Sequence, residues 1–376
     1  MSKFPPRADR QRKRAYLTAV AGCTAATLLL TACGNAQSST SSAPDGMPSS
    51  GEVMFFGQSR ENPYFGQNEV GAREVAESYG WDVSYVEAST QEEQDSAIQQ
   101  ILAQGAKPVG VVLNPISGEA AVASEQAIKA AGIPLVILNQ VPTEEQDSLF
   151  DAYAGVNDYG SGRTAAQLLI AGAQKAGVPL GDGLIVNTVA GHTAAQQRVA
   201  GFTDELKQSS PSSAVLSDVT SGGFLEAEGY SIGSQVIPAN KGKFTWVYGV
   251  NDALALGAIR AAKENGILPG KDALFVGGTC MNANTNAAVI NGELVGSAIQ
   301  SPLVEGQSAI YALAAYLNNG SVLDGDADLS ADAPPSIDTP PHKRNFMPNT
   351  KLDGTAASFD STTIWGRPAS ELCNYS

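Results

Sequence analysis

Short apolar runs alternate with stretches of helical periodicity along most of the chain. The first run, residues 53–57, is apolar on both faces and leads into a helical stretch, which is the pattern of a central strand in a parallel sheet. The same pattern predicts strands at 53–57, 82–86, 109–113, 134–138 and 153–156, with helices at 64–78, 91–103 and 118–131 between them. A second series predicts strands at 184–189, 214–219, 245–249, 274–277 and 294–300, with helices at 160–176, 194–208, 225–237, 253–265 and 283–291.

The two series predict an α/β protein with two Rossmann-like, doubly wound lobes joined by a hinge. Each strand–helix–strand unit has the length of a right-handed crossover. A helix at 302–317 follows the last strand of the second series and would return to the first lobe. The predicted organisation is an N-terminal lobe of residues 52–155 plus 301–320, a C-terminal lobe of residues 156–300, and a hinge near Val156, Gln300 and the segment after Leu317.

Residues 321–376 form an acidic, Pro-rich C-terminal extension in which residues 321–350 show no periodicity. This composition predicts an irregular segment. Asp324, Asp326 and Asp328 resemble the start of a calcium loop. Leu329 stands where such a loop needs Gly, however, and Pro335 stands where it needs Glu, so we expect no metal site.

The first 32 residues have the pattern of a secretory signal. A basic stretch precedes residues 15–32, which are rich in small residues and leucine. A transmembrane helix is the alternative, but 15–32 is at the short limit for spanning, and a polar, serine-rich segment follows at once. The sequence ending in Ala32-Cys33-Gly34 resembles the lipobox of bacterial lipoproteins, which implies removal of residues 1–32, a lipid on Cys33 and a flexible tether at 33–51.

The four cysteines separate into different roles. Cys23 leaves with the signal and Cys33 carries the lipid, so Cys280 and Cys373 remain in an oxidising exterior. This pair predicts one disulfide, worth roughly 4 to 5 kcal/mol on the chain-entropy model. Two buried thiols are the alternative.

Composition and charge exclude several classes of function. Charged residues make up 16% of the chain, and loss of six basic and one acidic residue with the signal changes the net charge from -15 to -20. Neither nucleic acid nor an acidic membrane surface is an expected partner of such a chain. The sequence has no nucleophile elbow, dinucleotide-binding glycines at a strand–helix junction, Walker loop or metalloprotease motif, and only two histidines. We therefore expect a protein that is not an enzyme and has no cofactor.

Polar and aromatic side chains follow the predicted strands of both lobes. Because ligands of open α/β sheets bind beyond the carboxyl ends of strands, we expect these side chains to converge at a cleft between the lobes. The first lobe contributes Gln58, Asn62, Tyr64, Phe65, Asn114, Asn139 and Gln140, and the second contributes Arg198, Asn251, Thr279 and Gln300.

Structural roles are open for some of these residues and their neighbours. Tyr64 and Phe65 have the alternative of being the first core residues of a helix. Asn-Pro at 62 and 114 is ordinary turn chemistry, and Asp252 is better explained as a helix N-cap than as a ligand group. His192 follows a strand end and has two equal interpretations, a cleft residue or a loop residue.

The order of motifs resembles the type I periplasmic sugar-binding proteins, the ribose-binding-like receptors of bacterial ABC importers, over about residues 53–317. The motifs are Asn62-Pro63-Tyr64-Phe65, residues 131–136, Arg198 with Gly201-Phe202, residues 251–258, and Gln300-Ser301-Pro302. The resemblance implies stacking of a sugar on Tyr64 and Phe65, with a further aromatic face from Phe224. It also implies hydroxyl contacts from Asn62, Asn114, Arg198, Asn251 and Gln300.

Two positions depart from the family pattern. Asn139 and Thr279 stand where the family usually has acidic residues that grip hydroxyls. We hypothesise that Arg198 then lacks a balancing carboxylate and accommodates a polyol or a sugar carrying an acidic group.

The resemblance implies a monomeric, extracytoplasmic solute receptor that is held to the membrane only through lipidated Cys33. It would capture a sugar, polyol or sugar acid and deliver it to an ABC permease and its ATPase. The alternative is a ligand-sensing receptor that presents a small molecule to a membrane signalling protein.

Overall fold

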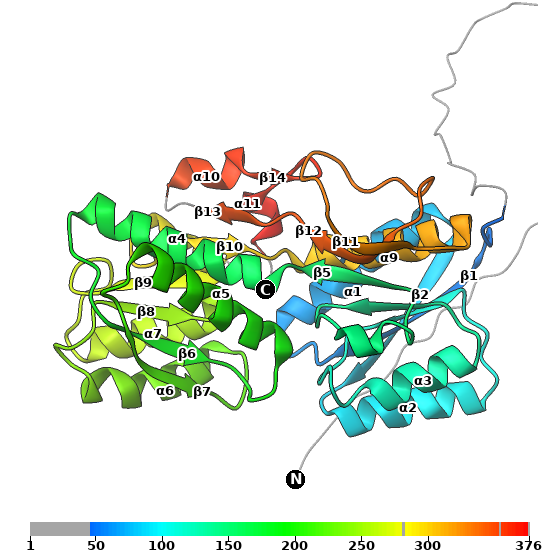
Figure 1. Cartoon of the computed structure of the whole chain (residues 1–376), viewed down its shortest axis with the longest axis horizontal. Coiled ribbons are helices and arrows are strands. Elements are labelled where there is room, and N and C mark those ends of the chain that lie inside the picture. Colours follow the sequence, from blue (N-terminus) through cyan, green and yellow to red (C-terminus); the bar gives the residue numbers. More distant parts are fainter. Residues whose placement is uncertain (1–45, 280–282, 353–354, 375–376) are drawn as a thin grey trace, which may run out of the picture. The chain divides into compact units, whose positions relative to one another are not determined.

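A computed structural model of the chain describes residues 46–279, 283–352 and 355–374. The predicted signal, Cys33, most of the tether and Cys280 lie outside these residues. The described residues form two α/β lobes, each built on its own sheet, as predicted (Figure 1). Residues 47 and 48 of the expected tether pack on the first lobe, where Met47 is buried and the Pro48 carbonyl accepts a hydrogen bond from the Trp81 indole.

The first lobe contains a seven-stranded parallel sheet. Its order is β11-β12-β5-β4-β3-β1-β2, so the order reverses beside β1, which is a topological switch point. Side chains of β1 alternate between two cores: Val53 and Phe55 face one, and Met54 and Phe56 face the other. The strands are β1 (Gly51–Gln58), β2 (Trp81–Ala88), β3 (Gly110–Leu113), β4 (Leu135–Leu138), β5 (Ala152–Val156), β11 (Leu323–Asp328) and β12 (His342–Met347).

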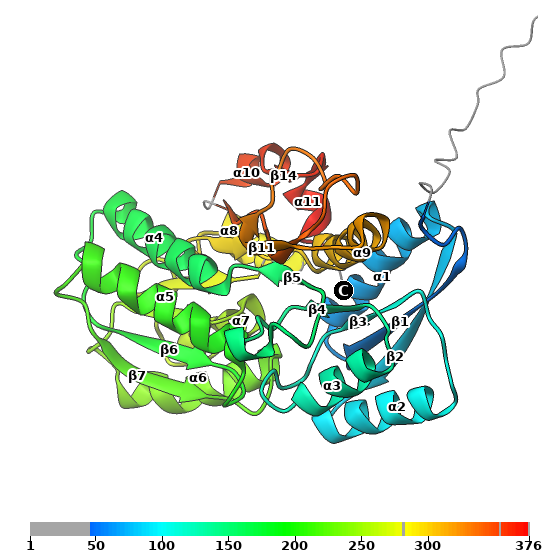
Figure 2. The ribbon, with the colours of Figure 1, turned by 45° about the vertical axis from the view of Figure 1, so that its right-hand side comes forward.

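Helices cover both faces of this sheet. One face carries α1 (Pro63–Ser78) and α9 (Pro302–Asn319), and the other carries α2 (Gln91–Ala103) and α3 (Val122–Ala130) (Figure 2). The helix predicted at 302–317 therefore returns to the first lobe, as expected. A short 3-10 helix, η1 (Glu144–Gln146), precedes β5.

The second lobe contains a six-stranded sheet of order β13-β10-β9-β8-β6-β7, in which only β13 is antiparallel to its neighbour. Its strands are β6 (Gly183–Asn187), β7 (Val215–Thr220), β8 (Trp246–Gly249), β9 (Leu274–Gly278), β10 (Ser297–Ile299) and β13 (Thr350–Leu352). Its helices are α4 (Asp158–Ala176), α5 (Thr193–Ser209), α6 (Glu226–Ala239), α7 (Asp252–Glu264) and α8 (Ala283–Ile290).

The prediction of an irregular C-terminal extension is wrong. The chain after α9 adds β11 and β12 to the first sheet, crosses at residues 347–350, and adds β13 to the second sheet. The third crossing between the lobes is therefore at 347–350 and does not follow Leu317 directly. The chain then forms α10 (Ala356–Ser361), the ribbon β14 (Thr363–Ile364) and β15 (Arg367–Pro368), and α11 (Ala369–Leu372).

Cys373 follows α11, is fully buried and is disulfide-bonded. Because Cys280 lies outside the described residues, its pairing with Cys373 stays a prediction. Among the residues that the structure describes, no helix has the length and apolarity to cross a membrane.

Candidate functional site

A pocket lies between the carboxyl ends of the two sheets and is lined by side chains of both lobes. It encloses about 40 Å³, enough for a few water molecules. Nine of the predicted site residues line it, together with His192: Asn62, Tyr64, Phe65, Asn139, His192, Arg198, Phe224, Asn251, Thr279 and Gln300.

The first lobe supplies two aromatic rings on the first turn of α1. Asn62 caps this helix by accepting a hydrogen bond from the Tyr64 backbone N–H at 3.1 Å, and Pro63 begins the helix. The cap leaves the Asn62 amide nitrogen for a ligand. Tyr64 and Phe65 pack edge to face at 5.6 Å and are both buried. They are core residues of the helix start and also line the pocket.

The second lobe supplies a further ring, that of Phe224, which packs edge to face on His192 at 5.0 Å. His192 caps α5 because its Nδ1 accepts a hydrogen bond from the Ala195 N–H. Burial lowers the pKa of His192 to about 3, with the Arg198 charge adding to the effect, so the imidazole is neutral at neutral pH. Asn251 caps α7 and donates its amide to the Phe224 carbonyl at 2.9 Å.

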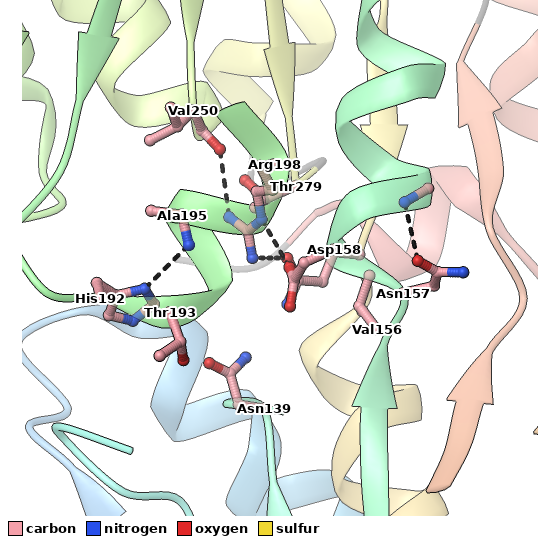
Figure 3. Close-up of polar contacts among 12 residues, drawn as sticks. Asn139, Val156, Asn157, Asp158, His192, Thr193, Ala195, Arg198, Val250 and Thr279 are labelled. Carbon is pink, nitrogen blue, oxygen red and sulfur yellow. Dashed lines mark hydrogen bonds and ion pairs between the residues drawn. The ribbon is translucent and has the colours of Figure 1, made fainter. Parts of the chain in front are cut away.

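Arg198 on α5 is buried and forms an ion pair with Asp158, the first residue of α4, at 2.8 Å (Figure 3). Burial raises the pKa of Asp158 to about 6, and the Arg198 guanidinium opposes this rise. The expectation that Arg198 lacks a balancing carboxylate is therefore wrong. Helices α4 and α5 approach closely at Gly162 and Gly201, where a Cβ would clash with the backbone of the other helix, and this approach brings Arg198 over Asp158.

The remaining contacts of Arg198 leave polar groups for a ligand. The guanidinium also donates to the Val250 carbonyl at 3.2 Å and to Gln300 Oε1 at 2.5 Å. Three of its five N–H groups are thus used and two remain. Gln300 is buried, and its Nε2 has no hydrogen-bond partner among the described residues. An unpaired buried amide is costly, so this nitrogen marks a position for a ligand acceptor.

Buried acidic residues contact Asn139 and Thr279, the two positions that depart from the family pattern, the first through its carboxylate and the second through its backbone. The Glu305 carboxylate, which does not line the pocket, accepts a hydrogen bond from Asn139 Nδ2 at 3.1 Å. On the other side, Thr279 Oγ1 accepts the Asp252 N–H, and the Asp252 carboxylate accepts the Ser297 hydroxyl. The N-cap of α7 is Asn251, so the expectation that Asp252 is the cap is wrong by one residue.

The structure does not bring Gln58, Asn114 and Gln140 to the pocket. Gln58 donates to Asn114 Oδ1 at 3.1 Å, and both side chains are buried in the first lobe. Gln140 donates to the Pro115 carbonyl and accepts the Thr193 hydroxyl of the second lobe at 2.9 Å. Gln58 and Gln140 thus connect the strand ends behind the pocket by hydrogen bonds within the protein, and Asn114 takes part through its Oδ1.

Asp158 and Glu305 contact lining residues of the pocket, and the sequence does not predict this placement. An acidic residue in the first turn of a helix is ordinary helix chemistry. No spacing in the chain distinguishes these two acids from the exposed ones. Among the described residues, no group of three or more His, Cys, Asp or Glu side chains is placed to hold a metal ion.

Comparison with known proteins identifies the family. A family model described as periplasmic binding protein domain matches residues 53–321, most of the chain. The chain belongs to the periplasmic binding protein family. This membership makes it an extracytoplasmic solute-binding protein and confirms the expectation that it is not an enzyme.

Proteins whose names refer to sugars are similar to this chain. The chain is 28% identical over 234 residues to the galactofuranose-binding protein YtfQ of Escherichia coli (strain K12), covering 62% of this chain and 71% of the relative. The crystal structure of a periplasmic ribose ABC transporter from Conexibacter woesei DSM 14684 matches with a TM-score of 0.70 at 22% identity, over 88% of this chain and 99% of that chain.

A third relative is the periplasmic binding component of the arabinose ABC transporter from Shewanella sp. ANA-3, bound to L-arabinofuranose. It matches with a TM-score of 0.67 at 25% identity, over 81% of this chain and 92% of that chain. These matches confirm the predicted type I periplasmic binding protein fold.

Proposed function

We propose that the protein captures a neutral sugar or sugar-like polyol in the pocket between its lobes and delivers it to the permease of an ABC importer. The observation that carries this proposal is the combination of aromatic faces from both lobes with the unpartnered Gln300 amide and the spare Arg198 donors. Aromatic rings pack on the C–H faces of a sugar ring, and convergent polar groups bind its hydroxyls.

The charge of the pocket favours a neutral ligand over a sugar acid. Arg198 is the only cationic side chain among the lining residues, and Asp158 already balances it. His192 stays neutral because burial lowers its pKa. A carboxylate ligand would therefore be buried without a free cation, which is costly.

The relatives support this class of ligand, since their names refer to galactofuranose, ribose and arabinose. The pocket lies between the lobes, so we expect a monosaccharide to enter when the lobes separate. A ligand that contacts both lobes then favours the closed form by its differential affinity.

Lipid attachment at Cys33 is a second part of the proposal. It is supported by the sequence from Leu28 to Gly34 and by the polar segment that follows. Expression of the full chain in a bacterium fed labelled palmitate should label the wild-type protein and leave Cys33→Ala unlabelled. Labelling of both would contradict it.

The ligand proposal is tested by thermal-shift screening of residues 46–376 against L-arabinose, D-ribose, D-galactose, myo-inositol and D-galacturonate. A ligand at 100 times its dissociation constant stabilises the folded state by about 2.7 kcal/mol. We expect a shift with at least one neutral compound. A shift with galacturonate alone, or with none of the five, would contradict the proposal.

A further inference from the structure

A buried carboxylate lies directly behind the first-lobe half of the pocket. Glu305, on the first turn of α9, is fully buried and is not one of the lining residues. It accepts hydrogen bonds from the Tyr64 hydroxyl at 2.8 Å, from Asn68 Nδ2 at 3.0 Å and from Asn139 Nδ2 at 3.1 Å. Helices α1 and α9 can approach this closely because Gly71 and Gly306 have no Cβ. A Cβ at either position would clash with the backbone of the facing helix.

The contact with Glu305 fixes which way the Asn139 amide points. An ionised carboxylate only accepts hydrogen bonds, so the amide nitrogen faces Glu305 and the amide oxygen is left for the pocket. The backbone of Asn139 is held as well. Its φ of 70° is left-handed, which Asn tolerates, and its carbonyl accepts the Tyr153 hydroxyl at 3.0 Å.

We propose that Glu305 is a positioning residue that orients Asn139 so that its oxygen, and not its nitrogen, receives a ligand hydroxyl. This role rests on the proposed function. An acidic side chain at position 139 would offer a carboxylate oxygen to the ligand. Here the Asn139 amide oxygen takes that place, and the negative charge is on Glu305, behind Asn139. Glu305 also holds the Tyr64 ring through its hydroxyl, so one carboxylate orients two pocket residues.

Protonation of Glu305 should weaken this orientation. Burial raises its pKa to about 7, against the hydrogen bonds that lower it. A protonated carboxyl donates its own O–H, so it no longer requires the Asn139 nitrogen to face it. The ionisable groups that interact with Glu305 are Tyr64 of α1, Tyr153 of β5 and Asp158 of α4, and Arg198 of α5 pairs with Asp158.

A swap of amide and carboxylate tests the orientation directly. Asn139→Asp places two carboxylates in contact, and Glu305→Gln places two amides in contact, so each single variant loses a matched donor and acceptor. The double variant restores one carboxylate and one amide in reversed order, and Asp also tolerates the left-handed backbone. Melting of all four proteins needs no sugar and gives the coupling between the two positions.

The expected melting result is a loss in each single variant that is largely recovered in the double variant. For Asn139→Asp the loss should grow from pH 6 to pH 8, as both carboxylates ionise. Additive losses in the double variant would overturn the proposed pairing.

Calorimetric titration with L-arabinose and with myo-inositol measures the effect of Glu305 on ligand affinity. We expect Glu305→Gln to weaken binding about tenfold at pH 8. Wild-type affinity should fall from pH 8 to pH 6, and that of Glu305→Gln should fall less, because Asp158, with its pKa of about 6, begins to protonate in both proteins. Asp158, Arg198, Tyr64, Tyr153 and His192 are present in both proteins, so the difference between the two profiles isolates Glu305.

Glu125→Gln is the matched control. Glu125 is also buried in the first lobe with its pKa raised to about 7, but it bonds Gln146 away from the pocket. For both Glu305 and Glu125 the folded protein keeps a proton up to about pH 7, whereas the unfolded chain releases it near 4.5. Stability should therefore fall as the pH rises through this window, and either Gln variant should remove part of that slope.

Only Glu305→Gln should change the affinity and its pH profile. Equal affinities and profiles for wild type and Glu305→Gln would overturn the positioning role. If neither compound nor any other member of the screening panel binds wild type, the proposed function fails. Recovery of melting temperature in the double variant would then still support the Glu305–Asn139 contact.

Discussion

At the scale of single residues, the site places neutral side chains at the ligand surface and puts its carboxylates behind them. Asp158 and Glu305 are fully buried, and their carboxylates contact Arg198 and Asn139 respectively. The buried Asp252 carboxylate accepts the Ser297 hydroxyl, and Ser297 Oγ accepts the Thr279 backbone N–H. Charges in a second layer fix the geometry of the lining groups without binding the ligand themselves. A site of this kind can hold hydroxyls firmly while its lining contains only one charged side chain, Arg198.

The ion pair beneath the pocket should be essential for stability. Asp158→Asn leaves the buried Arg198 cation without its counterion, which should lower the free energy of unfolding by about 3 to 5 kcal/mol. Urea denaturation of wild type and variant measures the difference. Asp204→Asn is the control, because Asp204 pairs with Lys207 at an exposed position and should change stability by less than about 1 kcal/mol. Similar losses in the two variants would contradict this account.

At the scale of elements, two pairs of closely packed helices place the functional side chains. Gly162 and Gly201 allow α4 to approach α5, and Gly71 and Gly306 allow α1 to approach α9. The first pair brings Arg198 to Asp158, and the second brings Glu305 to Tyr64. The glycines therefore serve the site as well as the packing of each lobe.

A methyl group in one of these contacts should disturb both packing and binding. Gly201→Ala would push its Cβ into the Tyr159 backbone, so we expect a loss of roughly 1 to 3 kcal/mol in unfolding free energy, together with weaker sugar binding. Gly66→Ala is the matched control, since nothing lies within 4 Å of a Cβ at this helical position. It should stabilise the protein by up to about 1 kcal/mol. Equal effects of the two substitutions on melting would argue against close packing at Gly201.

Elements with strong periodicity could be predicted from the sequence, and those without it could not. The runs at 53–57 and 109–113 are buried central strands, so their apolar pattern identified them. Strand β11 (Leu323–Asp328) is an edge strand with mostly exposed side chains, and its Asp-rich sequence carries no apolar alternation. Only its pairing with β12 makes this segment a strand.

The site residues also divide into those that the sequence predicts and those that it does not. Asn62, Tyr64 and Arg198 could be found because they follow strand ends in a family-like order. Asp158 and Glu305 could not, because their roles depend on which helices pack together. Gln58, Asn114 and Gln140 have the same amide chemistry as the lining residues, and only the structure shows that they lie behind the pocket and bond to other groups of the protein.

At the scale of the whole molecule, the C-terminal segment contacts both lobes. Leu372 and Cys373 belong to the core of the second lobe. The Trp365 indole donates to the Ser330 carbonyl at 2.9 Å, and its ring packs edge to face on Tyr311 of α9. In both ribbon views this segment lies beside α9 (Figures 1 and 2). The segment thus links the lobes on the side of their crossings, in addition to the three crossings themselves.

Loss of the Trp365 ring should weaken this link. Trp365→Ala removes a large, partly buried ring and an exposed hydrogen bond, so we expect a fall of about 1 to 3 kcal/mol in the free energy of unfolding. Arg367→Gln, which removes a partly exposed ion pair with Glu74, should cost less than about 1 kcal/mol. Urea denaturation compares the two. A Trp365→Ala protein as stable as wild type would show that the contact contributes little.

The central claim is that the pocket between the lobes binds a neutral sugar or polyol. Its most direct test is calorimetric titration of residues 46–376 with D-galactose, L-arabinose and D-galacturonate, repeated on Phe224→Ala. Phe224 lines the pocket and is not in the core clusters of the described residues, so its truncation should remove ligand contact with little loss of stability. We predict that a neutral sugar binds more tightly than galacturonate and that Phe224→Ala weakens this binding at least tenfold. Tighter binding of galacturonate, or unchanged binding by Phe224→Ala, would contradict the account.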